Sequence, residues 1–289
     1  MFSFDEGLTF REDEMMKPKI GTPRGVLNLK VGEKKFQLSR YLPSQDLSFF
    51  VEHYWIVSWD LRGQEPYVQE TLPYPSVHLV FEKNNSHVFG VGRRKFSRLL
   101  EDKGQVFGIK FKPGAFYPFV KLPVSNFTDT SISFGDVFGI DGNILEDAIF
   151  SREDEAEMRE IGEHFLHERF PERDENVAEV NRIVDYIIAH PEVTRVDDIV
   201  NCLNLNKRTL QRLFSQYVGV SPKWVIQRYR LHEVAERLAD DKAVDCTEMA
   251  LDLGYFDQAH FIKDFKAIVG WTPAEYAKRV AEVPDFDGT

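Results

Sequence analysis

A repeat near the C-terminus constrains the fold of this 289-residue chain more than any other feature. Residues between positions 198 and 205 return fifty positions later, and residues between 210 and 222 return fifty-one positions later. The matched pairs are Asp198 with Glu248, Ile199 with Met249, Val200 with Ala250, Leu203 with Leu253, Leu205 with Tyr255, Leu210 with Phe261, Phe214 with Phe265, Gly219 with Gly270 and Pro222 with Pro273. One supersecondary unit therefore occurs twice.

Each copy has the pattern of a helix-turn-helix. A short apolar helix is followed by a residue type that tolerates a left-handed turn, Asn204 in the first copy and Gly254 in the second. A longer helix follows and ends at Gly and Ser/Thr-Pro. The repeat spacing changes from fifty to fifty-one residues between Leu205 and Leu210, so the second copy has one extra residue there. Because the second helix of this motif reads the major groove, two copies joined by a helix over residues 222–238 predict a two-headed DNA reader.

The charge of the chain favours DNA binding only when it is examined locally. The net charge is −11, and residues 176–289 carry 14 basic and 18 acidic side chains. Between Asn206 and Arg230, however, there are six basic residues and no acidic one. Salt screens charges beyond about 8 Å, so the local excess matters more than the total. We expect a basic surface on the first copy.

The spacing of polar residues predicts which side chains face DNA, because positions i and i+4 share one helix face. Arg reads guanine, Gln reads adenine, and Ala or Ile contacts a thymine methyl. The alternatives are an ordinary solvated face for these side chains and a core position for Ile262. The expected base-reading residues are Arg208, Gln211, Arg212, Gln258, Ala259, Ile262 and Lys263, and the expected backbone or flanking contacts are Lys207, Ser215, Lys223, Arg228, Arg230 and Lys266.

The connecting helix sets the distance between the two reading heads. About seventeen helical residues span roughly 25 Å. Successive major-groove faces lie about 34 Å apart on one side of the duplex. We therefore expect one asymmetric site of about twenty base pairs per monomer, with some bending of the DNA.

The first half of the chain is β-rich. Residues 77–81 and 107–111 alternate between apolar and other positions, and turns are predicted at 84–85 and 102–104. Residues 47–59 fit a short helix leading into a strand, without settling where one gives way to the other. These patterns predict an α+β, β-rich N-terminal domain, with a cupin-like fold as one candidate, ahead of an all-α tandem helix-turn-helix domain.

Composition and helix-breaking residues divide the chain into five expected segments. Residues 1–20 are expected to be a disordered leader, and 21–150 a β-rich effector or dimerisation domain. Residues 151–175 are expected to form a charged linker helix that ends before a polar break. Residues 176–280 form the DNA-binding domain, and 281–289 an acidic tail.

The C-terminal residues also resemble a known protein family. Residues 177–279 resemble the DNA-binding domain of the AraC/XylS family of bacterial transcription regulators. The matching stretches are Lys207-Arg-Thr-Leu-Gln-Arg-Leu-Phe214, Gly219-Val-Ser-Pro222, Ala250 with Leu253-Gly254-Tyr255, and Asp257-Gln-Ala-His-Phe261 followed by Phe265, Gly270, Pro273 and Tyr276. The resemblance implies sequence-specific binding to double-stranded DNA, contact with RNA polymerase and a homodimer. It implies base reading at the seven positions named above, with Lys263 standing where members often have Arg.

Residues 41–139 resemble an N-terminal domain found in part of this family. The similar stretches are Tyr41-Leu-Pro43, Phe50-Val-Glu-His-Tyr-Trp55, Glu70-Thr-Leu-Pro73, Val77-His-Leu-Val-Phe81, Gly108-Ile-Lys-Phe-Lys-Pro-Gly114 and Asp136-Val-Phe-Gly139. This resemblance implies a sensing or dimerisation role and no known ligand. An apolar pocket is one interpretation of its aromatic residues, and core packing is the other. We name Trp55, Glu70 and His78 as candidate effector-pocket residues.

Other functions find little support in the sequence. The histidines lack the close spacing of a helical metal pair, and no nucleophile elbow, catalytic cysteine site or two-carboxylate site is present. We therefore expect no enzyme activity, no catalytic residues, no metal and no cofactor. Two cysteines without metal-ligand spacing, and the lack of a signal or a long apolar run, favour a cytoplasmic protein that does not enter membranes.

The sequence thus predicts a transcription regulator whose tandem readers are controlled through the N-terminal domain by a possible small-molecule effector. Two alternatives remain open. The N-terminal domain either serves only dimerisation or protein interaction, or is an enzyme fused to a DNA anchor. A dry, fully packed core favours the first alternative, and a cleft with two convergent titratable groups favours the second.

Overall fold

The computed structural model describes residues 25–27, 29–240 and 246–281. The expected leader at 1–20 and the tail beyond residue 281 lie outside these described residues. The N-terminal half contains strands β1 (Gln37–Tyr41), β2 (Val51–Asp60), β3 (Tyr67–Thr71), β4 (His78–Glu82), β5 (His87–Phe89), β6 (Phe96–Leu100), β7 (Lys103–Phe111) and β8 (Ser131–Ser133). Its helical elements are α1 (Leu29–Gly32), η1 (Leu47–Phe49), α2 (Tyr117–Val120), η2 (Val124–Phe127), α3 (Phe134–Phe138), α4 (Gly142–Phe150) and α5 (Glu155–His167).

Six strands form one antiparallel sheet in the order β1-β2-β7-β4-β5-β8, and β3 pairs with β6 in a separate two-stranded ribbon. The prediction of a β-rich N-terminal domain is confirmed. The apolar run at 47–59 is a single 3-10 turn, η1, followed by β2. The turn predicted at 102–104 is shorter than expected, since only Asp102 has a positive φ (52°) and Lys103 already begins β7.

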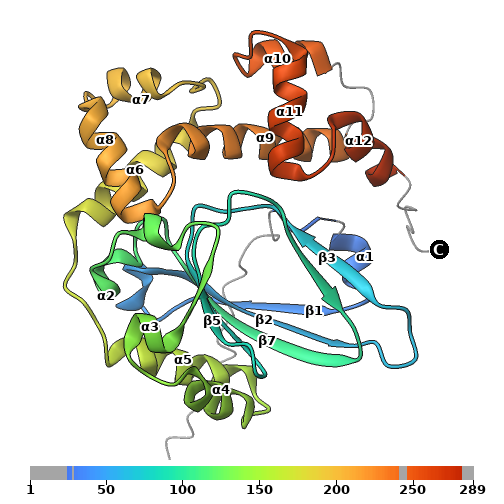
Figure 1. Ribbon diagram of the computed structural model, residues 1–289, viewed down its shortest axis with the longest axis vertical. Helices are drawn as coiled ribbons and strands as arrows, with labels where there is room; N and C mark the ends of the chain where they lie inside the picture. Colours follow the sequence, from blue (N-terminus) through green and yellow to red (C-terminus); the bar gives the residue numbers. More distant parts are fainter. Residues whose placement is uncertain (1–24, 28, 241–245, 282–289) are drawn as a thin grey trace, which may run out of the picture.

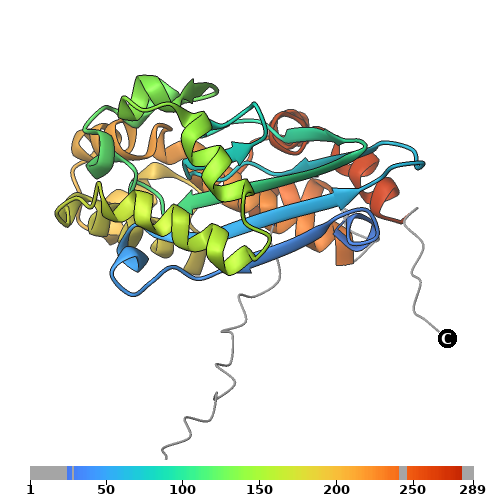
Figure 2. The same ribbon diagram turned by 90° about the horizontal axis from the view of Figure 1, so that it is seen from below.

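The sheet has one packed face and one face that borders a cavity. Tyr54, Phe81 and Phe107 point to the packed face, where α3, α4 and α5 cover them. Seen from below, these green helices lie in front of the sheet and the orange C-terminal helices lie behind it (Figure 2). Alternation along each strand therefore sends neighbouring residues to two different environments.

Helix α5 belongs to the N-terminal core, so the prediction of a linker helix at 151–175 is wrong. Its Met158, Phe165 and Leu166 are at most 2% exposed and pack in the same cluster as the sheet residues. The sequence of this helix resembles a linker because many of its other residues are charged. Those charged positions form its outer surface, which is usual for a surface helix with one apolar stripe.

Two tryptophans on β2 lie flat against glycines of the neighbouring strand. Trp55 is opposite Gly108, and Trp59 is opposite Gly104. A Cβ added to Gly108 would lie 2.0 Å from Cε2 of Trp55, and one added to Gly104 would lie 2.2 Å from Cζ2 of Trp59. The strand therefore needs glycine at both positions, and the two indoles form a flat floor on the cavity side of the sheet.

The C-terminal half is entirely helical in its described residues. It contains α6 (Glu175–Ala189), α7 (Val196–Cys202), α8 (Lys207–Leu213) with the π-helical turn η3 (Phe214–Val218), α9 (Pro222–Asp240), α10 (Cys246–Asp252), α11 (Gln258–Val269) and α12 (Pro273–Ala281). The two helix-turn-helix units are α7 with α8 and α10 with α11, joined by α9 (Figure 1). The predicted tandem architecture is confirmed.

The hydrogen bonds of the two turns repeat as the sequence does. The amide of Leu205 donates to the carbonyl of Val200, and the amide of Tyr255 donates to that of Ala250. Asn204 and Gly254 both have positive φ, 50° and 71°. The extra residue of the second unit is therefore Phe256, which lies between Tyr255 and the N-cap Asp257 and is 96% exposed.

We predict that Gly108→Ala lowers the free energy of unfolding by about 1–3 kcal/mol, because the new methyl group overlaps the Trp55 indole. Adding Trp55→Leu should recover part of this loss, since the smaller side chain frees that space. Gly92→Ala, where the nearest atom is 3.9 Å away, is the control and should stay within about 0.5 kcal/mol of the parent. Chemical denaturation measures all four proteins, and equal effects at the two glycines would contradict the steric argument.

Candidate DNA interface and interdomain cavity

The reading face of the first unit is exposed along α8. The Asn206 side chain caps this helix by accepting from the amides of Arg208 and Thr209, at 3.0 and 3.1 Å. Leu210 is buried, so the opposite side of the helix faces solvent. Of the predicted contacts, the exposed ones in this unit are Lys207, Arg208, Gln211, Arg212, Ser215 and, at the start of α9, Lys223. Lys207 Nζ forms an ion pair with Asp197 at 2.6 Å.

The second unit presents a less charged face along α11. Asp257 caps this helix by accepting from the amide of His260 at 2.8 Å. Ile262 is half-buried against the second hydrophobic core, so only part of its side chain reaches the surface. The remaining predicted contacts, which are Gln258, Ala259, Lys263 and Lys266, are exposed.

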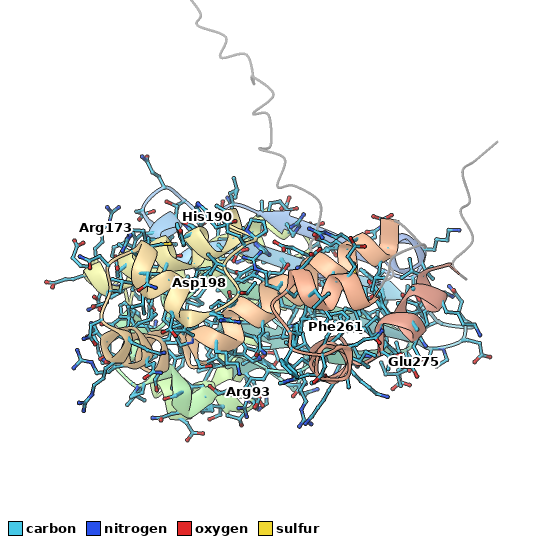
Figure 3. All side chains as sticks on the ribbon, turned by 90° about the horizontal axis from the view of Figure 1, so that it is seen from above. Arg93, Arg173, His190, Asp198, Phe261 and Glu275 are labelled. Carbon is cyan, nitrogen blue, oxygen red and sulfur yellow. The ribbon has the colours of Figure 1, made fainter. Side chains whose placement is uncertain are left out.

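Helix α9 connects the two helix-turn-helix units. It has 19 residues, which corresponds to a length of about 28 Å. Gln227 of α9 donates to Asp264 of α11 at 2.9 Å. Both α8 and α11 run from the outer edge of the molecule back toward the N-terminal domain (Figure 1), and the units containing Asp198 and Phe261 lie side by side when seen from above (Figure 3).

Two predicted phosphate contacts are wrong for this structure, because Arg228 and Arg230 are only 1% and 2% exposed. Arg230 closes the end of α6 by donating to the carbonyls of Ile187, His190 and Val193, and it pairs with Glu233 at 2.7 Å. Arg228 points to the N-terminal domain and donates to the carbonyl of Pro73 at 2.6 Å. Sequence alone places both on an exposed helix because their partners lie far away along the chain.

The N-terminal domain contacts both units. Residues of the sheet domain and of the first unit form one continuous hydrophobic cluster. The rings of Tyr117 and Tyr217 are in contact, with 4.3 Å between their centroids and a 44° tilt, and Thr128 Oγ1 donates to the carbonyl of Gly219 at 2.6 Å. Near the second unit, Lys95 lies 4.4 Å from the ring centre of Trp271. The boundary that composition indicates near residue 175 is thus not a boundary between cores.

A cavity of about 1930 Å³ lies between the second face of the sheet, the β3–β6 ribbon and the C-terminal helices. Trp55 and His78, two of the candidate effector-pocket residues, line it. Glu70 does not, and its prediction as a pocket residue is wrong because its carboxylate pairs with Lys95. Side-chain alternation explains the difference, since the neighbouring residues Gln69 and Thr71 line the cavity instead.

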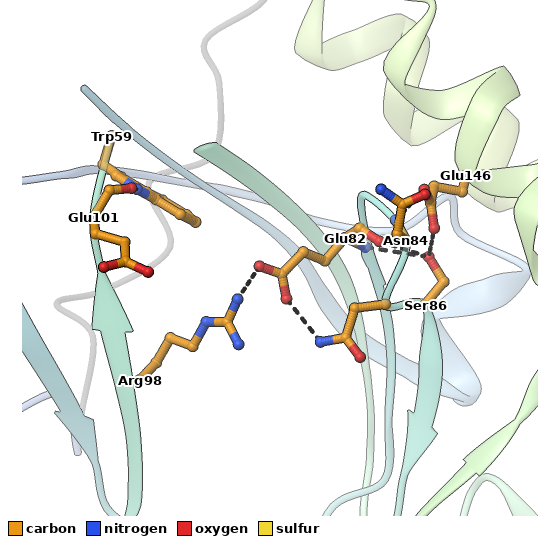
Figure 4. A network of polar contacts seen from close by, with 8 residues as sticks. Trp59, Glu82, Asn84, Ser86, Arg98, Glu101 and Glu146 are labelled. Atoms are coloured by element: carbon orange, nitrogen blue, oxygen red, sulfur yellow. Dashed lines mark hydrogen bonds and ion pairs between the residues drawn. The ribbon is translucent and has the colours of Figure 1, made fainter. Parts of the chain in front are cut away.

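An ion pair ties the ribbon to the sheet across this cavity. Arg98 of β6 donates to Glu82 of β4, as Figure 4 shows. At the end of β4, the buried carboxylate of Glu146 accepts from the amide of Asn84 at 2.6 Å and from Ser86 Oγ at 2.7 Å. Helix α4 therefore fixes the β4–β5 turn, and with it the position of Glu82.

The other end of the cavity holds a cluster of buried polar groups around Tyr74. Lys110 Nζ lies 3.8 Å and the Arg228 guanidinium 3.7 Å from the centre of the Tyr74 ring. Lys110 also donates to Glu52 at 2.9 Å, and burial lowers the pKa of its ammonium. Sequence reasoning missed Lys110, although a lysine between the apolar residues Ile109 and Phe111 was the available signal.

Two histidines in the cavity wall stay neutral near pH 7. Burial, followed by the charge of Lys110, lowers the pKa of His53 to about 3 and that of His78 to about 3. Among the described residues, no group of three or more potential ligands is arranged to hold a metal ion. None of the helices in the described part of the chain is long and apolar enough to cross a membrane.

Comparisons with known proteins match both halves. Residues 199–279 match a family described as a helix-turn-helix domain, and residues 39–133 match one described as a domain of unknown function. The chain is 31% identical over 114 residues to the probable transcription factor PqrA of Proteus vulgaris, covering 38% of this chain and 90% of that protein. The chain belongs to the AraC/XylS family of transcription regulators.

Two further relatives show the extent of the likeness. The XylDLEGF operon transcriptional activator 1 of Pseudomonas putida is 32% identical over 77 residues, which is 26% of this chain and 23% of that protein. The chain therefore spans about a quarter of the length of this relative. A transcriptional regulator of Chromobacterium violaceum with an AraC-type DNA-binding domain is 22% identical, covers 37% of this chain and 99% of that one, and has a TM-score of 0.32.

The neutral histidines predict a pH dependence of stability. Below about pH 6.5 the unfolded chain protonates its histidines, whereas folded His78 stays neutral until about pH 3, so stability is lost as the pH falls. His78→Gln should reduce the loss between pH 6.5 and 5 by up to about 2 kcal/mol. Denaturant titrations at the two pH values measure it. His164→Gln, at a histidine whose side chain is 77% exposed, is the control, and identical pH dependence in both variants would contradict the argument.

Proposed function

We propose that the two reading helices enter successive major-groove segments of one asymmetric operator. Arg208, Gln211 and Arg212 read the first segment, and the α11 residues Gln258, Ala259, Ile262 and Lys263 read the second. Lys207, Ser215, Lys223 and Lys266 contact the backbone or flanking positions. The observation that carries this proposal is the exposure of the basic α8 face in a unit whose capping and turn geometry match the motif.

The second part of the proposal is control of these readers by a small ligand in the interdomain cavity. The cavity is lined by the sheet on one side and by residues of α9 and α11 on the other. A ligand bound there contacts the connector helix directly, so it shifts the orientation or freedom of the two units. A fully packed core would favour a purely structural N-terminal domain. One face of the sheet instead borders the cavity.

One observation supports the alternative of a protein-interaction domain. Val68 and Leu99 face each other across the β3–β6 ribbon and are 51% and 49% exposed. Such a pair suits a contact with another protein. Assembly as a homodimer and contact with RNA polymerase, which the family resemblance implies, are part of the proposal, and so is a cytoplasmic location.

Arg212→Ala tests the reading face. Losing a bidentate contact to a base should weaken operator binding by about 1–3 kcal/mol and relax the preference at one base pair. The measurement is selection of bound sites from random duplex DNA with the parent and the variant, followed by affinities for the selected site. Arg182→Ala, at an arginine paired with Glu179 on α6, is the control. An unchanged base preference in Arg212→Ala would show that α8 does not read with this face.

Lys223→Ala tests the backbone contacts. A single phosphate contact contributes about 0.9 to the slope of log affinity against log salt, so the variant should bind all duplexes more weakly with a slope lower by about one. Fluorescence anisotropy at four salt concentrations measures the slope. Lys83→Ala, an exposed lysine of the N-terminal domain, should keep the parent slope. A change in base preference without a change in slope would reassign Lys223.

A further inference from the structure

The loop that joins β5 to β6, residues 90–95, is attached at one end to the first helix-turn-helix unit. The amide of Arg93 donates to Oδ1 of Asp129 at 2.7 Å, and Nε of Arg93 donates to Oδ2 at 2.6 Å. The residue before Asp129 is Thr128, whose hydroxyl donates to the carbonyl of Gly219. Gly219 ends the helical segment that begins with α8, so this end of the loop lies beside the end of the first reading helix.

The other end of the loop is attached to the second unit. Lys95 lies over the ring of Trp271, and a Cβ added to Gly270 would lie 2.7 Å from Cε of Lys95. Gly270 ends α11, the second reading helix. Because Gly219 and Gly270 are equivalent positions of the repeat, the loop spans the gap between corresponding ends of the two reading helices.

The loop carries three consecutive cations, and two of them reach solvent. The Lys95 side chain is 13% exposed and pairs with Glu70, so it serves as an anchor. The Arg93 side chain is 59% exposed although it pairs with Asp129. Arg94 is exposed and forms no ion pair within the described residues. Two carboxylates against three cations leave the solvent side of the loop positive.

The position of the loop continues the proposed DNA interface. Seen from above, Arg93 lies on the side of the molecule where α11 is viewed end-on, and between the unit that contains Asp198 and the unit that contains Phe261 (Figure 3). The flanking contacts Lys223 and Lys266, both exposed, lie in the chain four residues from the two glycines that the loop joins. The cations of the loop therefore bridge the basic positions of the two heads.

The shape of DNA determines what such a loop would meet. Two major-groove segments that face the same side of the duplex are about 34 Å apart, and the minor groove with its bordering phosphates faces that side midway between them. A loop between two heads seated in these segments therefore faces phosphate groups. Arginine binds a phosphate through two parallel hydrogen bonds, which suits the side chains of Arg93 and Arg94.

We propose that Arg93 and Arg94 of the N-terminal domain contact the phosphates beside the central minor groove of the operator. The inference rests on the proposed function, because it requires the two heads to occupy successive major-groove segments of one site. Base reading stays with α8 and α11, whereas the loop adds affinity and fixes the position of the protein along the duplex. The N-terminal domain is then a third point of contact with DNA.

The test uses the full-length protein and the operator selected from random duplex DNA. Arg93→Ala and Arg94→Ala should each weaken binding by about threefold to tenfold and lower the slope of log affinity against log salt by about one, and the double variant should lower it by about two. The base preference should not change. Phosphate ethylation interference should map central phosphates in the parent and lose them in the double variant. Arg62→Ala is the matched control, since this arginine is also exposed (66%) and paired with an aspartate, Asp60.

Three outcomes overturn the assignment: a parent-like salt slope in the double variant, central interference that persists in that variant, or an equal loss in Arg62→Ala. The site itself distinguishes this failure from that of the proposed function. A selected site that covers a single helical turn contradicts the proposed function, and the inference with it. A site with two separated halves and no interference at the phosphates between them contradicts only the contact made by Arg93 and Arg94.

Discussion

The contact between the connector helix and the sheet determines how the rest of this regulator is arranged. Arg228 inserts from α9 into the N-terminal domain, where it donates to Pro73 and stacks on Tyr74. Lys110 approaches the other part of the same ring system from the floor of the sheet. Two cations on one aromatic ring are tolerated because the ring face is electron-rich and Glu52 lies beside Lys110. This contact borders the cavity and joins the sheet domain to the helix that connects both reading heads.

The DNA-reading half could be predicted in detail from sequence because its information is local. The turn residues Asn204 and Gly254, the N-caps Asn206 and Asp257, and the repeat spacing all lie within one motif. Local rules of helix capping and turn conformation then determine which faces are buried. The slip of one residue corresponds to the exposed Phe256 in the second turn.

The interdomain site could not be predicted in the same way because its partners are distant in sequence. Arg228 and Pro73 are 155 residues apart, and on a helix surface an arginine in a basic stretch has the same local signature whether it faces phosphate or protein. Glu70 failed as a pocket residue because a shift of one position in β3 reverses the face of the strand. Trp55 and His78 do line the cavity, because alternation along β2 and β4 places both on the cavity side of the sheet.

The two reading heads differ in how they are attached to the N-terminal domain. The first unit shares a continuous hydrophobic core with the sheet domain, whereas the second has its own core, which includes only Leu27 and Leu72 from the N-terminal half. Between these attachments α9 borders the cavity, with Arg228 in its second turn. Under the proposed ligand control, a ligand in the cavity would act on a helix whose first unit shares a core with the sheet domain and whose second unit packs mainly in a core of its own. The second head is the one expected to shift, and because its reading face carries fewer charges, the spacing between the heads becomes the variable that a signal can adjust.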